Sequence, residues 1–351
     1  MSEPSLKGAA YSLVRNHKAI GLDVESIRVT HEVSTPTMFE FVVPVQSIRN
    51  PWSAMQLENM RPGDEISIAL GRGSVKPMVT GDVTLLWPQV NADPGQRSKI
   101  TVAGFDRMER LRFGAHTRTF VEYSDLSIMR EVARTAGLSN VRMQGRPGKP
   151  LPYVLQNDES DYDFLIRRCA ECDYEMLMQD TTLVFRPSAQ GLGEIKALQY
   201  YKDFDRVSLK LSVPRRGSSV TVTGYDLRSG EKFEGRANGS AGQQRIAGST
   251  TGYAAAGSVL PQSPIGFSRP DITDRDAAQD YAEAQYARGT SAFITGTVGL
   301  FRGDETLTAG TNVELLGLGG DFDGLYYISK STHLYEQGAY QTELEVRRNG
   351  I

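Results

Sequence analysis

The sequence predicts a mainly β protein in which two similar antiparallel β-barrel, tube-like domains bracket a small α+β region. Three observations predict this fold class. Apolar and polar residues alternate with a period near two from Lys18 to about Arg112, which is typical of strands. A helical period takes over in the middle of the chain, and strand patterning then returns. The closing segment also repeats the order of strands and turns seen in the opening one.

The 351 residues are enough for two or three domains with a substantial buried core. We expect a first β-barrel domain over residues 1–118 and a small α+β insertion over 119–190. A second β-barrel domain is expected in two pieces, 191–234 and 290–351, with a flexible Gly/Ser-rich loop and a helix between them over 235–289. The loop is expected to be mobile, because residues 235–268 contain too little apolar material to offset the entropy of ordering.

The first domain is expected to be a series of strands joined by proline-containing and polar turns. Its strands are SIRVTHEV (26–33), MFEFVVPV (38–45), DEISIAL (64–70), PMVTGDVTLLWPQV (77–90) and SKITVAGFDRM (98–108). The last two flank the polar segment 91–98. This arrangement predicts a long hairpin whose tip projects into solvent or onto a partner.

Helical periodicity begins in the segment YSDLSIMREVARTAGL. Ser124 or Asp125 can cap the N-terminus of this helix, and Gly137 is placed to end it. Further on, EMLMQDTTLVFRP predicts two short strands around a turn at Gln179 and Asp180.

A later helix is predicted in DITDRDAAQDYAEAQYARG, where Thr273 and Asp276 form a capping box and Gly289 is the C-terminal stop. Strand patterning precedes it in RVSLKLSVPRRGSSVTVTGYDLRSGEKFEG. Four closing strands follow, in SAFITGTVGL, NVELLGLG, LYYISKSTHLYE and YQTELEVRR.

The segment ESDYDFLIRRCAECDYEM contains Cys169 and Cys172 in the C-x-x-C spacing of disulfide oxidoreductases. Ser160 and Asp163 form a capping box, so the helix is expected to start near Asp161. Both cysteines then fall on the apolar stripe of the helix, more than two turns from its N-terminus. A thiolate gains no help from the helix dipole at that depth, and we therefore predict a structural helix rather than a redox site.

The chain is expected to contain an internal repeat. Residues 63–70 and 310–316 are each a glycine-led strand, and each is followed by a glycine-containing turn. A long strand, a polar tip and a returning strand follow in both places, over residues 78–90, 91–98 and 99–107 in the first copy and 325–335, 336–339 and 340–348 in the second. Any two antiparallel meanders share such features, so coincidence is the alternative explanation.

Five segments follow one another in the order seen in the late control gene D proteins of phages: VAGFDRMERLRFG, the helix with ARTAGL, YVLQNDESDYDFLIRRCAECDYEM, VTVTGYDLRSGEKFEGRA and FDGLYYISKSTHLYEQGAYQTELEVRR. The chain therefore resembles these baseplate hub proteins of contractile tails over nearly its whole length. The hub half of the VgrG spike proteins of type VI secretion is similar.

The resemblance implies a homotrimer in which each subunit contributes two similar β-barrels. Three chains would present six near-equivalent barrels in a ring, which can stack on a sixfold tail tube while remaining threefold for the central spike. The implied partners are the tail tube ring, a spike protein and the baseplate wedge proteins. Because the sequence ends at Ile351, directly after the second repeat, we expect the spike to be a separate polypeptide and no peptidoglycan-cleaving domain to be attached.

Charge and composition exclude several classes of protein. Net charge is −3, and the Lys and Arg residues are scattered, so no specific nucleic-acid binding is expected. The N-terminal segment lacks an apolar signal region and no run approaches a membrane span, which predicts synthesis in the cytoplasm before assembly into a particle. Two cysteines three residues apart cannot form a disulfide framework.

No catalytic residue, cofactor or metal site is expected. The four histidines have no second His, Cys or acid at ligand spacing; they are His17, His31, His116 and His333. Asp158, Glu159, Asp161 and Asp163 crowd one helix start, where acids ordinarily complement the helix dipole, although a calcium or acid/base site is the alternative. The glycine-rich segments 317–324 and 71–74 favour tight turns over a cation loop and a P-loop respectively.

The resemblance, together with the absence of an expected catalytic or metal site, implies a non-enzymatic structural hub that adapts the sixfold tail tube to the threefold spike. The alternatives are a tail-tube or tube-initiator protein, a cell-wall hydrolase and a C-x-x-C redox protein. The 91–98 tip and the strand edges are the expected contacts to the first tube ring.

Overall fold

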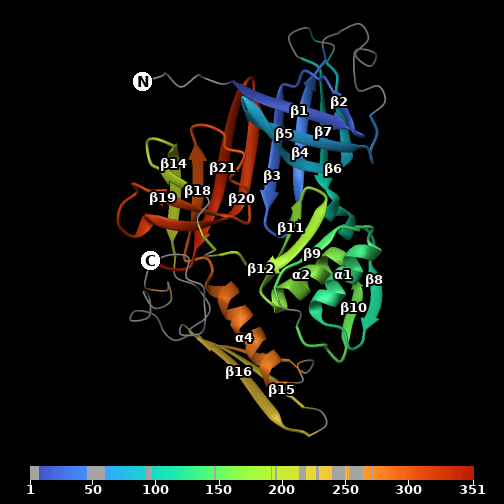
Figure 1. The fold of residues 1–351 in the computed structure, drawn as a ribbon, viewed down its shortest axis with the longest axis vertical. Helices are drawn as coiled ribbons and strands as arrows, with labels where there is room; N and C mark the ends of the chain where they lie inside the picture. The colour runs from blue at the N-terminus through green and yellow to red at the C-terminus, as the bar shows by residue number, and fades with distance from the viewer. Residues whose placement is uncertain are drawn as a thin grey trace.

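The computed structural model describes residues 8–45, 60–91, 93, 97–145, 148–190, 192–193, 196–212, 219–226, 229–238, 250, 252, 264–269, 272 and 274–351. Strands dominate, in one large sheet and three small ones, and helices gather in the lower half of the molecule (Figure 1). The predicted fold class, mainly β with an α+β insertion, is confirmed.

The first β unit is an antiparallel array with strand order β3-β4-β7-β6-β5-β1-β2. Its strands are β1 (Ala9–Arg15), β2 (Lys18–Ile20), β3 (Ser26–Glu32), β4 (Thr35–Pro44), β5 (Glu65–Arg72), β6 (Ser74–Gln89) and β7 (Lys99–Asp106). The five predicted strands are confirmed, while β1 lies before the point at which strand patterning was expected to begin. Alternate side chains such as Ile27, Val29, Phe39 and Phe41 point into one core, which explains the period of two.

The second β unit has strand order β14-β18-β21-β20-β19-β13. Its strands are β13 (Ala197–Gln199), β14 (Phe204–Leu211), β18 (Ile294–Leu300), β19 (Asn312–Leu316), β20 (Gly324–Glu336) and β21 (Ala339–Arg348). A second core, which includes Val298, Val313, Ile328 and Leu344, fills this unit.

The two β units have the same topology. Apart from the additional strand β2, the sheet order in each unit is second, third, sixth, fifth, fourth and first strand of that unit along the chain. The match extends to single hydrogen bonds. Gly63 N–H donates to Val83 O (2.8 Å) and Val83 N–H to Asp64 O (2.9 Å), whereas Gly310 N–H donates to Ile328 O and Ile328 N–H to Thr311 O, both at 2.8 Å.

Further details of the backbone repeat as well. Gly63 and Gly310 have positive φ values of 93° and 86°, a conformation that glycine adopts readily. A register shift follows directly in each long strand, between Val83 and Leu85 in β6 and between Ile328 and Lys330 in β20. The two units differ at the last strand of this order: β1 pairs antiparallel with β5, whereas β13 pairs parallel with β19.

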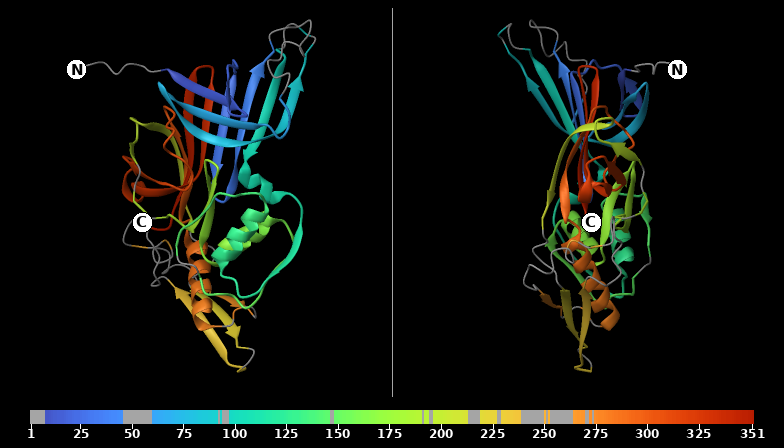
Figure 2. Two further views of the ribbon diagram at one scale, coloured as in Figure 1. Left: turned by 45° about the vertical axis from the view of Figure 1, so that its right-hand side comes forward. Right: turned by 90° about the vertical axis from the view of Figure 1, so that its left-hand side faces the viewer.

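The two β units are joined into one 13-stranded sheet, a feature that the sequence analysis did not anticipate. Strand β20 of the second unit pairs antiparallel with β3 of the first unit over seven residue pairs. Figures 1 and 2 show the two units side by side at one end of the molecule.

Between the units along the chain lies an α/β lobe, residues 107–187. It contains the 3₁₀ helix η1 (Arg107–Arg112), β8 (His116–Phe120), α1 (Asp125–Thr135), β9 (Val141–Met143), β10 (Val154–Glu159), α2 (Asp161–Glu171), β11 (Tyr174–Gln179) and β12 (Thr182–Pro187). The predicted helix boundaries are confirmed: Ser124 and Ser160 cap α1 and α2, and Gly137 has a positive φ just after α1. The predicted turn at Asp180 is also present between β11 and β12.

A further unit, here called the α4 unit, lies at the far end of the molecule. It consists of β15 (Ser219–Tyr225), β16 (Lys232–Asn238), β17 (Ile265–Ser268) and α4 (Arg275–Thr290), which share a small core. The sequence analysis placed residues 219–234 with the second barrel, and this was wrong: β15 and β16 form a separate three-stranded sheet with β17. The physical reason is that α4 packs closely on this sheet, where a Cβ on Gly235 would come within 2.2 Å of the Ala278 backbone.

Three other predictions for this region need correction. Part of the expected 235–268 loop is ordered as strand, at its start in β16 and at its end in β17; its middle lies largely outside the described residues. The cap of α4 is Asp274, whose side chain accepts from Ala277 N–H at 2.9 Å, and Thr273 lies outside the described residues. The helix does not stop at Gly289 but continues to Thr290, whose hydroxyl donates to the Tyr286 carbonyl in the last turn.

Candidate functional site

The joint between the β units brings together two parts of the chain that are about 300 residues apart in sequence. Residues 330–336 of β20 pair with residues 26–32 of β3, and the rings of His31 and His333 meet across the joint with centroids 5.6 Å apart. His333 is fully buried. The sequence analysis could not detect this pair, because the two histidines are about 300 positions apart and neither has a local partner.

Both histidines are held by hydrogen bonds from neighbouring strands. His31 Nε2 lies 2.8 Å from the carbonyl oxygen of Met78, and His333 Nδ1 lies 2.8 Å from the hydroxyl oxygen of Tyr340. Burial lowers the pKa of His333 to about 3, and the adjacent His31 lowers it further. Burial also lowers the pKa of His31. The joint therefore holds neutral imidazoles at neutral pH.

The α/β lobe is fixed to both β units. Ser34, in the turn between β3 and β4, makes two hydrogen bonds to the lobe: its N–H donates to Met176 O at 2.9 Å, and the side chain of Tyr162 donates through Oη to Ser34 O at 2.7 Å. On the other side, the buried carboxylate of Glu175 accepts from Arg186 Nε at 2.8 Å and from the hydroxyl of Tyr327 in β20. These contacts hold the lobe against both units.

The C-x-x-C pair lies at the C-terminal end of α2. Cys169 is buried and Cys172 is the C-cap, half-buried, with its thiol donating to the Arg168 carbonyl at 3.3 Å. Burial raises the pKa of both thiols. Thiolate is disfavoured at both positions, in agreement with the structural interpretation of this helix.

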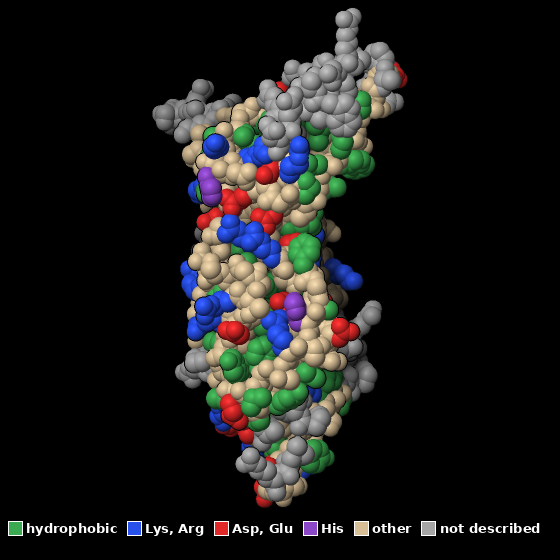
Figure 3. Space-filling model, turned by 90° about the vertical axis from the view of Figure 1, so that its right-hand side faces the viewer, with side chains coloured by type: hydrophobic (Ala, Val, Ile, Leu, Met, Phe, Trp, Pro, Cys, Tyr) green, Lys and Arg blue, Asp and Glu red, His purple; other side chains and the backbone are tan. Residues whose placement is uncertain are grey.

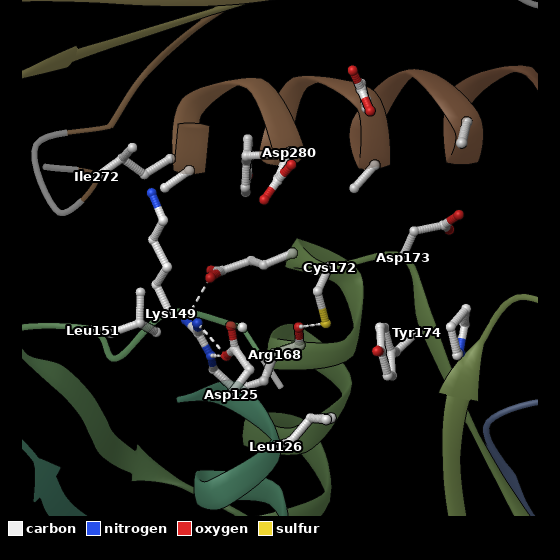
Figure 4. Close-up of a pocket in the computed structure, with 18 of the residues that line it drawn as sticks. Asp125, Leu126, Lys149, Leu151, Arg168, Cys172, Asp173, Tyr174, Ile272 and Asp280 are labelled. Atoms are coloured by element: carbon white, nitrogen blue, oxygen red, sulfur yellow. Dashed lines mark hydrogen bonds and ion pairs between the residues drawn. The ribbon is translucent and has the colours of Figure 1, made fainter. Parts of the chain in front are cut away.

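A cavity of about 780 Å³ lies between the lobe and the α4 unit (Figure 4). Its buried cation, Arg168, is already paired, with Nε donating to Asp125 Oδ1 at 2.7 Å and Nη1 bonded to Glu171. Arg269 Nη2 donates to Glu171 from the α4 side at 3.0 Å. Burial raises the pKa of Asp173, which also lines the cavity, to about 6. These charges hold two parts of the chain together and leave no unpaired cation or strong nucleophile among the residues named.

The four acids at the start of α2 do not form one site. Asp163 accepts from Ser160 Oγ at 2.7 Å and therefore bonds the cap hydroxyl rather than a backbone N–H. Asp161 is buried and bonded to Arg118 and to Gln156, the latter at 2.9 Å. Asp161 and Asp163 thus bind different partners and do not converge on one point, in agreement with the structural role expected for the acids of this helix start.

The remaining pair of this cluster and two histidines also have ordinary partners. Glu159 accepts from Arg167 Nη2 at 2.6 Å, and Asp158 N–H donates to Thr117 Oγ1 at 3.2 Å. His116 Nε2 lies 3.9 Å from Asp161 Oδ2, a contact that sequence spacing did not predict. His17 is exposed and lies 3.5 Å from Glu65.

Both glycine-rich segments are tight turns, as predicted. Gly73 has a positive φ between Arg72 and Ser74, which pair as the last residues of the β5–β6 hairpin. In the second segment, Asp323 Oδ1 accepts from Leu318 N–H at 2.7 Å, and Arg348 Nη1 donates to Asp323 O at 2.8 Å. Arg348 therefore bonds backbone carbonyl oxygens of this turn, those of Asp321 and Asp323.

Large apolar side chains are exposed on two opposite sides of the molecule. One set lies along the end of β6 and over the lobe: Leu85, Trp87, Val90, Phe113, Val121, Tyr123, Tyr153 and Leu155. Figure 3 shows hydrophobic side chains on this face, in both its upper and its lower half. Another set, with Tyr201, Leu211 and Phe301, lies at β14 and next to β18, at the other side of Figure 1. Exposed apolar patches of this kind are typical of interaction surfaces.

Within the described part of the chain, no three His, Cys, Asp or Glu side chains come together as a metal-binding group. No helix among the described residues has the length and apolar character needed to cross a membrane.

The fold is shared with solved structures of phage-like and secretion proteins. The 43 kDa tail protein of prophage MuSo2 from Shewanella oneidensis is 16% identical with a TM-score of 0.71, covering 97% of this chain and 98% of that one. A tail protein from Neisseria meningitidis MC58 is 14% identical with a TM-score of 0.72, covering 98% of both. The E. coli c3393 protein, described as a component of the type VI secretion system, is 12% identical with a TM-score of 0.60, covering 96% and 77%.

Among curated proteins, no sequence matches this chain. A family model described as the Alg8 N-terminal domain matches residues 16–337, which is most of the chain. The protein therefore belongs to the Alg8 N-terminal domain family.

Proposed function

We propose that this protein is a structural, non-enzymatic baseplate hub of a contractile injection system or phage tail. In this proposal a homotrimer adapts a sixfold tail tube to a threefold central spike. The observation that carries the proposal is the repeated topology of the two β units, down to the matching hydrogen bonds of Gly63 with Val83 and Gly310 with Ile328. A chain that builds the same unit twice offers six similar positions from three copies.

The fold comparisons support the same role. Two proteins of this fold are described as tail proteins and a third as a component of type VI secretion, and each match covers almost all of this chain. A tail or secretion particle is therefore the proposed location after synthesis. A tail tube ring, a separate spike protein and baseplate wedge proteins are the proposed partners.

The side chains that first suggested chemistry support a structural role instead. The thiols of α2 resist ionisation. At the cavity, Arg168 is paired with Asp125 within the lobe, and Glu171 of the lobe is paired with Arg269 on the α4 side. We propose that the chain acts through its surfaces. We also propose a domain division that follows these elements: a first β unit up to Asp106, the lobe over residues 107–187, and a second β unit in two pieces, 197–211 and 294–348, with the α4 unit between them along the chain.

The test is the mass of the native particle, measured with and without the tube protein of the same gene cluster. A trimer with three times the chain mass of 38.6 kDa, which then binds a ring of six tube subunits, is the expected result. A stable monomer or hexamer under all conditions contradicts the hub. Zymography on peptidoglycan is a separate control, in which a lytic band from the purified chain contradicts the non-enzymatic proposal.

A further inference from the structure

The repeated topology makes β6 the counterpart of β20, and β14 the counterpart of β3. Residues Val83 and Ile328 occupy matching positions, because each exchanges two hydrogen bonds with a glycine-led segment and each precedes a register shift. Strands β3 and β14 are the second strands of their units, and each pairs with the third strand of its own unit.

One of these two matching edges is filled and the other is open. In the chain, residues 330–336 of β20 pair with β3, which joins the two β units. The matching part of β6, from Leu85 onward, pairs with β7 only, and β14 pairs with β18 only, as far as the described residues show. Unpaired strand edges are templates for pairing with another chain.

The intrachain register can be transferred to the open edges. Counting from the register shift places Leu86 where Ser331 lies, Pro88 where His333 lies and Val90 where Tyr335 lies. The pairings of β4 with β7 and of β18 with β21 align β4 with β18, and the pairings of β3 with β4 and of β14 with β18 then align β3 with β14. This alignment places Leu211, Leu209 and Val207 where His31, Val29 and Ile27 lie. The pairs Ser331 with His31, His333 with Val29 and Tyr335 with Ile27 thus become Leu86 with Leu211, Pro88 with Leu209 and Val90 with Val207.

All six residues of these three pairs, which lie on one face of the strands, are apolar. The alternate pairs on the other face are Trp87 with Lys210 and Gln89 with Ser208. Val90 and Leu211 are 43% and 42% exposed in the single chain, and Leu86, Leu209 and Val207 are half-buried against the cores of their own units. Pairing would cover the apolar surface that remains. Pro88 has no N–H to donate, so the ladder is incomplete there and apolar contact has the larger share.

The two open edges lie on opposite sides of the molecule, as Figures 1 and 2 show. A contact between them is heterologous, and such contacts close into a ring when the rotation between copies permits it. We infer that the end of β6 in one copy pairs with β14 of the next copy, repeating between subunits the joint that β20 and β3 form within one chain. This inference rests on the proposed trimeric hub and names the surface that would hold it together.

The test is a disulfide between two positions that meet only across subunits. The variant with Leu86→Cys and Leu211→Cys in one chain is oxidised and run without reductant, and each single variant is the matched control. Crosslinked dimer and closed trimer are expected from the double variant alone. Native mass is measured in parallel: a trimer without crosslinks overturns this joint but leaves the hub standing, whereas a monomer overturns both.

A charge exchange tests the same pair without oxidation. Leu86→Lys alone and Leu211→Glu alone are expected to raise the concentration at which half of the trimer dissociates by about tenfold or more. The combination in one chain should restore assembly, because the two charges then face each other between copies. Single variants that remain fully trimeric, or a combination that is no better than either single change, overturn the joint. Far-UV circular dichroism checks that each variant is folded.

Discussion

Glu175 is the anchor between the lobe and the second β unit, and replacing it by alanine should destabilise the protein strongly. Glu175 is 4% exposed, and its carboxylate binds Arg186 and the hydroxyl of Tyr327. Removing one partner of a buried pair leaves the other charge unpaired, at a cost of about 3–5 kcal/mol. We expect a loss near 3 kcal/mol for Glu175→Ala, because the Arg186 side chain keeps 16% of its surface in water.

The assay is urea unfolding followed by tryptophan fluorescence and circular dichroism. Tyr327→Phe alone should cost about 1.5–3 kcal/mol, since it removes one hydrogen bond to a charged group. In the Glu175→Ala background the same change should cost almost nothing, because the hydroxyl has already lost its acceptor. Asp276→Ala is the control: it removes an exposed ion pair to Lys149 and should leave the midpoint unchanged. Additive effects of Glu175→Ala and Tyr327→Phe would refute the reasoning.

Three further predictions concern the repeat, the joint and the cysteines. Gly63→Ala should cost roughly 1 kcal/mol through its positive φ alone, and Gly310→Ala should cost more because its Cβ would lie 2.7 Å from an arginine nitrogen; urea midpoints compare the two, and equal losses would argue against this account. Because the pKa of His333 is lowered to about 3, its folded form binds fewer protons than the unfolded chain, so stability falls from about pH 6.5 towards pH 3. The His333→Asn variant should remove about 1.4 kcal/mol per pH unit from that slope, and an unchanged slope between pH 6 and 4 would contradict the neutral imidazole. Cys172→Ala should leave native mass and tube binding unchanged; loss of tube binding by an intact trimer would favour thiol chemistry instead.

The fold was predictable from the sequence wherever a backbone conformation requires a particular residue type at a nearby position. Gly63 and Gly310 introduce matching strands because their positive φ values favour glycine, and this made the repeat visible across 246 intervening positions. Ser124 and Ser160 were predictable as caps because a serine before an apolar period is a local signal.

Contacts between distant strand edges impose no such requirement. The pairing of β20 with β3, and with it the meeting of His31 and His333, depends on register between segments about 300 residues apart. The α4 unit was misplaced for a related reason. Its strands alternate in the same way as those of the barrels, and only the close approach of α4 to Gly235 assigns them to a separate sheet.

The internal repeat is present at one end of the molecule and absent at the other. The β6–β7 and β20–β21 hairpins both turn at the upper end of Figure 1, whereas the lobe and the α4 unit hang from the lower end. The α4 unit interrupts the β14–β18 connection, whose counterpart between β3 and β4 is a tight turn docked on the lobe. A ring of three such chains would thus present six comparable hairpins upward, and only three copies each of the lobe and of the α4 unit downward. The change from sixfold to threefold symmetry would then follow from where the insertions lie in the chain. The subunits would not need to adopt different conformations.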